Sequence, residues 1–158
     1  MLDASSAGRR MLRVTKLTDY ASVVLTVMAS APDTVMSASG LAEHAGLEVP
    51  TVAKVLKPLA QAGLVHAFRG ASGGYRLARA AEDITLVEIV EAMEGPLAMT
   101  ECSVHTGQCG IERSCGARAN WRRINDVVAD ALRSVTLAEM ISPAPAARKA
   151  IPVSLSAN

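Results

Sequence analysis

Aromatic side chains are scarce in this sequence, with one Trp, two Tyr and one Phe among 158 residues. Half of the residues are nevertheless hydrophobic, so the core must be mainly aliphatic, which suits helix packing better than a β-sandwich. No hydrophobic run approaches the ~20 residues that span a bilayer, and the first ten residues lack the apolar segment of a signal peptide. We therefore expect a mainly helical cytoplasmic protein with no membrane partner.

The excess of positive charge is also small. The net charge is +1, and taken alone it argues against a nucleic-acid partner. The charges are unevenly distributed, however. From Arg13 to Arg79 there are seven basic and four acidic residues, whereas from Glu82 to Glu101 there are six acidic residues and no basic one. Only the first of these segments suits a phosphate backbone.

Catalytic patterns are missing as well. The sequence has no Ser/His/Asp constellation and no glycine-rich nucleotide-binding loop. It also has three cysteines rather than the four that commonly ligate an electron-transfer cluster. We therefore do not expect an enzyme.

The N-terminal half follows the order of a winged helix-turn-helix domain. Apolar residues at helical spacing, with capping and breaking residues at the ends, predict three helices: 18–31, 37–45 and 50–62. Thr18 is the expected N-cap of the first helix. Two short strands, 64–69 and 75–78, are expected around a tip with three glycines. The predicted fold is therefore mainly α, with a small β-hairpin wing and a DNA-binding domain over residues 11–80.

The C-terminal half predicts a dimerisation element. The motif Thr85-x-x-Glu88 is a capping box that opens a helix, and Thr136-x-x-Glu139 opens a short last one. Between them lies a loop with all three cysteines, followed by apolar residues at coiled-coil spacing: Trp121, Ile124, Val128, Ala131 and Val135. We assign residues 81–141 to the cysteine loop and to long C-terminal dimerisation helices, and expect 1–10 and 142–158 to be disordered extensions.

The third helix and the hairpin carry side chains suited to DNA. The N-terminal residues of such a helix reach base edges in the major groove. A glycine-rich wing can place an arginine in the minor groove while its backbone approaches a phosphate. The candidate contacts on these two elements are Thr51, Lys54, Lys57, Arg69, Ser72, Gly73, Gly74 and Arg76. A winged helix used only for protein interactions, with ordinary solvated lysines, is the alternative.

The cysteines Cys102, Cys109 and Cys115 have the spacing C-x6-C-x5-C. Structural zinc usually requires tighter cysteine pairs, and a disulfide would leave one thiol over in a reducing cytoplasm. Three thiolates on a loop with glycines suit an iron–sulfur cluster that takes its fourth ligand from elsewhere. The spacing alone leaves open a redox-sensing thiol trio, a zinc site or three unrelated cysteines.

Together the two halves resemble the IscR/NsrR-type family of bacterial winged-helix iron–sulfur regulators. The likeness covers residues 11–141 and is carried by these stretches: Leu12-Arg13-Val14-Thr15-Lys16-Leu17-Thr18-Asp19-Tyr20-Ala21, Gly63-Leu64-Val65, Arg69-Gly70-Ala71-Ser72-Gly73-Gly74-Tyr75-Arg76-Leu77, Glu94-Gly95-Pro96, Thr100-Glu101-Cys102 and Asn120-Trp121. Family members commonly begin where Met11 stands, so residues 1–10 are an extension or a mis-set start. The cysteine spacing with its Thr-Glu-Cys lead is most similar to the subgroup that regulates the SUF iron–sulfur assembly operon.

The resemblance implies a homodimer in which each subunit carries a 2Fe-2S or 4Fe-4S cluster on its three cysteines. The fourth ligand is open. Arg118 stands where IscR-like members have a histidine ligand, whereas Asp19 falls on the aspartate that NsrR-like members supply from the partner subunit. Asp19 could equally be a plain helix-start carboxylate. His105 is a second candidate for the fourth ligand.

Two residues of the third helix depart from the family pattern. Ala53 replaces a glutamate of IscR-like members, so their operator preference does not carry over. Pro58 removes a backbone hydrogen bond, and we expect a kink or a tightened last turn there.

The predicted function is a DNA-binding regulator, a repressor of iron–sulfur cluster assembly genes, whose affinity for a double-stranded operator depends on the cluster. The alternatives are a thiol-redox or zinc sensor on the same scaffold, or a nitric-oxide or iron-status regulator of other genes.

Overall fold

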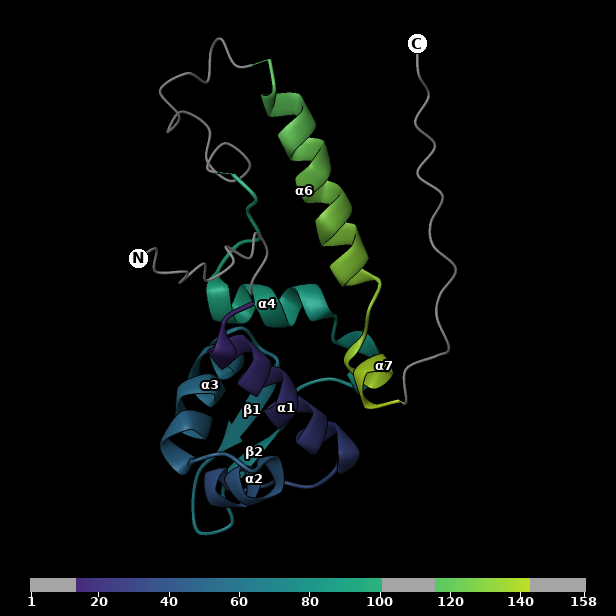
Figure 1. Ribbon diagram of the computed structural model, residues 1–158. Coiled ribbons are helices and arrows are strands. Elements are labelled where there is room, and N and C mark those ends of the chain that lie inside the picture. The colour runs from purple at the N-terminus through teal and green to yellow at the C-terminus, as the bar shows by residue number, and fades with distance from the viewer. Residues whose placement is uncertain (1–13, 101–115, 143–158) are drawn as a thin grey trace, which may run out of the picture.

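The computed structural model describes residues 14–100 and 116–142. They form a small helical domain from which one long helix projects (Figure 1). The elements follow in the order α1 (Lys16–Ser30), α2 (Ala38–Ala45), α3 (Val49–Gln61), β1 (Val65–Phe68), β2 (Gly74–Leu77), the 3-10 helix η1 (Ala81–Asp83), α4 (Leu86–Glu94), α6 (Arg118–Arg133) and α7 (Leu137–Ile141). This mainly helical architecture with one two-stranded antiparallel sheet confirms the predicted fold class.

The first helix begins earlier than the sequence predicted. Thr15, not Thr18, is the N-cap of α1, with extended backbone angles and a hydroxyl that accepts from the Thr18 N–H at 3.3 Å. Thr18 lies inside the first turn and is buried. The prediction was wrong because two threonines three residues apart can both cap, and the buried environment of Thr18 selects the earlier one. Asp19 still lies in the first turn, as expected.

The helix-turn-helix pair is built as predicted. The Ser37 hydroxyl caps α2 by accepting from the Gly40 N–H at 3.0 Å, and Gly46 ends the helix in the left-handed conformation. The apolar stripe of α3 is buried in the core: Val52, Val55, Leu56 and Leu59. Pro50 stands in the first turn, where it is tolerated.

Pro58 does not end α3, which continues to Gln61. Its carbonyl accepts from the Ala62 N–H at 2.9 Å, and the Gly63 N–H bonds the carbonyl of Ala60, three residues back, at 3.1 Å. The same pattern ends α2, where the Gly46 N–H bonds the carbonyl of Glu43, so the tightened end of α3 is due to Gly63 and the kink or tightened turn expected of Pro58 stays a prediction. Gly63 then closes the helix with a φ of 74°.

The wing is tied to the body by a contact that the sequence did not predict. β1 and β2 pair antiparallel, and the backbone of Met36, from the α1–α2 connection, pairs with Tyr75 through hydrogen bonds of 2.8 and 2.9 Å. This backbone pairing places Met36 against Gly74 so closely that a Cβ atom on Gly74 would overlap the Met36 carbonyl. A Cβ on Gly73 would overlap the Phe68 carbonyl. Both glycines therefore have a packing reason beside their predicted role at DNA.

The chain after the wing returns to the core. The Glu88 carboxylate accepts from the Thr85 N–H and hydroxyl at 2.9 Å each, and starts α4 as predicted. Thr85 also pairs with Thr136, so the starts of α4 and α7 lie side by side. Leu137 of α7 is fully buried in the core with Ile84 and Ile89. The C-terminal helix is thereby part of the winged-helix body.

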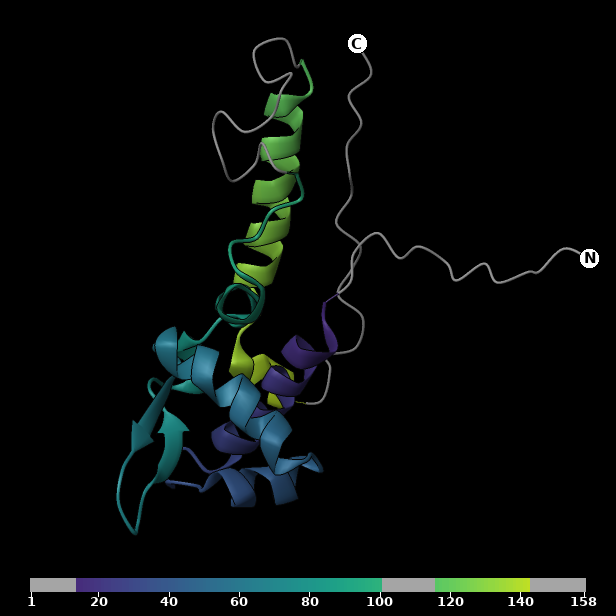
Figure 2. The ribbon, with the colours of Figure 1, turned by 90° about the vertical axis from the view of Figure 1, so that its left-hand side faces the viewer.

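Helix α6 projects away from the body, and its free end lies opposite the wing tip (Figures 1 and 2). None of its residues is buried. None of the helices in the described residues has the length and hydrophobicity to cross a bilayer. The expected extensions, 1–10 and 142–158, lie outside the described residues apart from Ser142, which is the C-cap of α7.

Candidate functional site

The polar side of α3 is presented to solvent because its apolar stripe is fixed in the core. Lys54 and Lys57 are exposed, Thr51 is half-buried, and Ala53 is exposed between them. The predicted contacts on this helix therefore lie on an accessible surface. The small side chain of Ala53 leaves that surface without the carboxylate that IscR-like proteins would carry.

The wing adds two arginines to the same half of the molecule. Arg69 and Ser72 are exposed at the hairpin tip, and the wing extends away from the helices (Figure 2). Arg76, on β2, is half-buried and its guanidinium lies 5.3 Å from the centre of the Phe68 ring. Sequence reasoning missed Phe68, although a tip spanning 69–73 places it diagonally across the hairpin from Arg76. Arg79, by contrast, pairs with Glu88 at 2.7 Å.

Asp19 lies on another surface, at the start of α1. Its side chain is exposed and helps line an open groove of about 610 Å³ with residues from α1, its N-terminal flank, α4 and α7: Val14, Thr15, Lys16, Ser22, Leu86 and Met140. Within residues 14–100 and 116–142 no three His, Cys, Asp or Glu side chains are grouped to hold a metal ion. Cys102, Cys109, Cys115 and His105 lie outside those residues, so the predicted ligand set stays a prediction.

Glu94 joins the end of α4 to the start of α1. Its Oε1 accepts from the Thr18 hydroxyl at 2.6 Å and from the Thr15 N–H at 2.8 Å, across more than 70 positions of sequence. These hydrogen bonds, the one from Thr18 foremost, hold the pKa of Glu94 below its usual value. Glu94 precedes the undescribed cysteine segment by seven residues. One carboxylate thus connects the entrance of that segment with the turn that carries Asp19.

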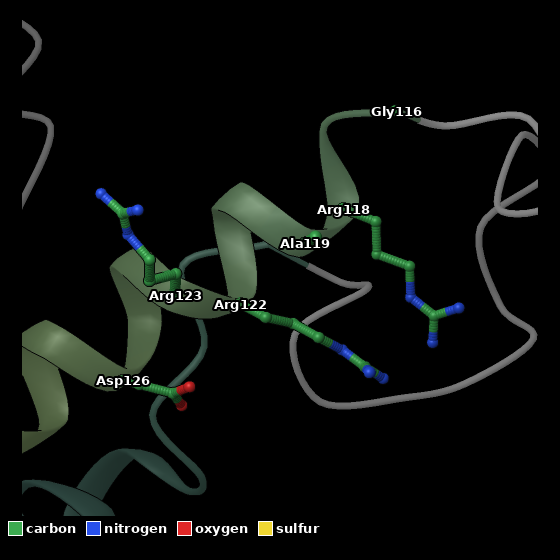
Figure 3. Close-up of a pocket in the computed structure, with 6 residues that line it drawn as sticks. All are labelled: Gly116, Arg118, Ala119, Arg122, Arg123 and Asp126. Carbon is green, nitrogen blue, oxygen red and sulfur yellow. The ribbon is translucent and has the colours of Figure 1, made fainter.

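Helix α6 contacts the chain just before the cysteine segment. The Met99 N–H donates to Asn125 Oδ1 at 3.0 Å, so the chain entering the segment lies along the helix that leaves it. Arg118, Arg122 and Arg123 surround a shallow pocket of about 470 Å³ at the start of α6. Figure 3 shows Arg118 and Arg122 extending to the same side of the helix, and Arg123 to another.

The outer side of α6 is apolar and exposed. Trp121, Ile124 and Val127 are 38, 41 and 62% exposed. Of the other predicted seam residues, Val128 is half-buried and Ala131 is exposed, while α6 also packs on α4. Exposed apolar patches of this kind are typical of interaction surfaces.

A basic recognition helix, a glycine-rich wing and an exposed apolar helix define a winged-helix regulator of the DNA-binding class. A family model described as Rrf2, an iron-dependent transcriptional regulator, matches residues 14–143. The chain therefore belongs to the Rrf2 family, which is one of transcriptional regulators rather than enzymes.

Individual relatives agree with this membership. The chain is 33% identical to protein aau3 of Rhizobium meliloti, over 85% of this chain and 88% of that protein. It is 28% identical to the HTH-type transcriptional regulator IscR of Erwinia tasmaniensis, over 83% of this chain and 79% of that one. The structure of CymR, the global cysteine regulator of B. subtilis, matches with a TM-score of 0.64 and 27% identity, over 82% of this chain and 96% of that one. The resemblance to IscR is borne out, and the SUF subgroup stays a prediction.

We expect Glu94→Gln to destabilise the fold by about 1 kcal/mol at neutral pH, a modest amount because Glu94 is exposed. Its pKa in the folded protein is lower than the usual 4.5, so folding favours the carboxylate. This contribution is fully present above about pH 4.5 and is lost as the pH falls through the lower folded value. Urea unfolding at neutral and acidic pH measures it.

The matched control is Glu82→Gln, which alters an exposed carboxylate on η1. It should leave the free energy of unfolding nearly unchanged at both pH values. A Glu94→Gln deficit that is absent at neutral pH, or that stays constant into acid, contradicts the assigned role of this carboxylate.

Proposed function

We propose that this Rrf2-family protein is a homodimeric repressor that binds a double-stranded operator with α3 and the wing, and that an iron–sulfur cluster on Cys102, Cys109 and Cys115 sets its affinity. The observation that carries the proposal is an accessible basic surface on the same body to which Glu94, seven residues before the cysteine segment, is hydrogen-bonded. An operator as partner makes the cytoplasm the site of action. Genes for iron–sulfur cluster assembly, of the SUF type, are the proposed targets.

The donor set fits such a cluster. Three thiolates are the ligands that iron–sulfur clusters prefer. Asp19 is exposed in an open groove, and it and His105 are the two candidates for a fourth ligand, Asp19 from the partner subunit. When bound, a 2Fe-2S or 4Fe-4S cluster supplies an iron centre that responds to oxidants or to iron supply.

The chain's own contacts provide the route from this segment to DNA. Glu94 fixes the first turn of α1, and Asn125 fixes Met99 on α6. A change in how the cysteine segment is held therefore acts on α1 and α6 together, and alters how the two DNA-binding domains of a dimer are oriented. A coupling of ~1–3 kcal/mol is enough for a 5–150-fold change in operator affinity.

A thiol-redox sensor on the same scaffold is the second candidate. It is favoured by the likeness to CymR, whose structure is described as that of a global cysteine regulator. A zinc sensor, or a regulator of other genes that answers to nitric oxide or iron status, would use the same DNA surface. Metal analysis separates the thiol and zinc sensors from a cluster protein.

We expect Lys54→Ala and Arg69→Ala each to weaken binding to the duplex directly upstream of the protein's own gene by about fivefold, on the order of 1 kcal/mol. Each removes an exposed cation from α3 or the wing. Every lost phosphate contact should also reduce the slope of log affinity against log salt by about 0.9. Fluorescence anisotropy at several stated salt concentrations measures both.

Arg133→Ala is the matched control, because it removes an exposed arginine at the end of α6. Its operator affinity and salt slope should equal those of the unaltered protein. If all three variants bind alike, α3 and the wing do not form the DNA surface.

Anaerobically purified protein should contain iron and acid-labile sulfide, and alanine at Cys102, Cys109 or Cys115 should remove most of both. Asp19→Ala and His105→Ala keep all three thiolates, so whichever residue is the fourth ligand should show faster cluster loss in air. Colourless protein without iron or sulfide excludes the cluster. Stoichiometric zinc would then indicate a zinc sensor, and three titratable thiols without metal a thiol sensor.

Ile124→Asp should convert the dimer to a monomer at micromolar concentration, because it places a charge in the exposed apolar stripe of α6. Ala119→Asp adds the same carboxylate to an exposed site on another side of that helix and should leave the dimer intact. Sedimentation equilibrium distinguishes the two. A monomeric unaltered protein, or an intact Ile124→Asp dimer, contradicts dimerisation through this stripe.

A further inference from the structure

One face of the wing carries an aromatic–cationic pair that the proposed contacts leave unexplained. Alternation along β1 and β2 places His66, Phe68 and Arg76 on the same face, with His66 opposite Arg76 and Phe68 opposite Gly74. The strand residues Val65 and Leu77, on the other face, are buried in the core. Phe68 is the protein's one phenylalanine, and it is 40% exposed.

The Phe68 ring contacts a cation on this surface, since the Arg76 guanidinium lies 5.3 Å from its centre. That distance is within the range of a cation–π contact. The contact is diagonal across the hairpin, and it is open because the residue directly opposite Phe68 is a glycine. Gly74 is itself required by the close approach of the Met36 backbone. The packing that ties the wing to the body thus also frees the ring to meet the arginine.

An arginine side chain has many rotamers, and a DNA contact must select one of them. A ring that already holds the guanidinium reduces what binding has to restrict. A guanidinium held over the face of a ring can still donate from its edge to phosphate oxygens. Neither Arg69 nor Lys54 has such a contact among the cation–π pairs of the described residues, which join Lys16 to Tyr20 and Arg76 to Phe68.

We propose that Phe68 is a positioning residue, which holds Arg76 in the conformation that contacts a DNA phosphate beside the wing. The inference rests on operator binding by this surface. It attributes the affinity of the wing for DNA in part to the pair of Arg76 and the uncharged Phe68. On this proposal the strands of the wing, as well as its glycine-rich tip, contribute to DNA binding.

The test is a double-mutant cycle on the duplex directly upstream of the protein's own gene, with affinity measured at several salt concentrations. Phe68→Leu should weaken binding about two- to fivefold, the effect of losing one exposed cation–π contact. Phe68→Tyr keeps the ring and should bind like the unaltered protein. Arg76→Ala should weaken binding and also lower the salt slope by about 0.9.

The double variant Phe68→Leu with Arg76→Ala decides the test. If Phe68 acts through Arg76, then Phe68→Leu should have no further effect once Arg76 is alanine. An equal loss in both backgrounds, or full affinity for Phe68→Leu beside a weakened Arg76→Ala, overturns the inference. Unaltered protein that does not bind the duplex contradicts the proposed operator function instead. Thermal unfolding of each variant shows whether the hairpin remains folded.

Discussion

The carboxylate of Glu94 joins the winged-helix body at the start of α1 to the end of α4, from which the chain leads to the cysteines. It ends α4 and simultaneously accepts from the first turn of α1, so the DNA-binding body and the approach to the cysteines share one anchor. Thr18 can donate there because it is buried inside the turn while Thr15 takes the cap. Without this carboxylate the buried Thr18 hydroxyl would keep only its contact with the Thr15 hydroxyl at 3.0 Å, and the Thr15 N–H would lose its acceptor, so the expected loss of stability is modest.

Local chemistry made most elements predictable. Ser37, the Thr85 and Thr136 capping motifs, and the glycines after α2 and α3 each fix a helix end through atoms a few residues away. The unpredicted contacts join distant residues: Met36 with Tyr75, Thr85 with Thr136, and Glu94 with Thr18. Their partners are chosen by how the helices pack, and no spacing in the sequence encodes that. The misplaced N-cap of α1 has the same cause.

In the candidate site, too, residues set by local spacing could be predicted, whereas those set by contacts between distant residues could not. The exposed side of α3 followed directly from its buried stripe, so Lys54 and Lys57 were identifiable from helical periodicity alone. Phe68 was not, because its role depends on the register of the hairpin and on a glycine opposite. For Asp19 the sequence indicated a position, and the structure adds an open groove around it. The cysteines remain predicted ligands, since they lie outside the described residues.

Helix α6 explains why sensing and dimerisation would be inseparable in such a protein. Its inner side is held by α4 and, through Asn125, by the chain that leads into the cysteine segment. Its outer side is an uncovered apolar stripe, and its first turns carry the arginines next to that segment. Any rotation or shift imposed on the start of α6 therefore reaches the stripe directly, because a helix transmits displacement along its axis as a rigid body. A second subunit packed on that stripe would be displaced with it, so the spacing of two recognition helices becomes sensitive to the cysteine segment without any further linkage.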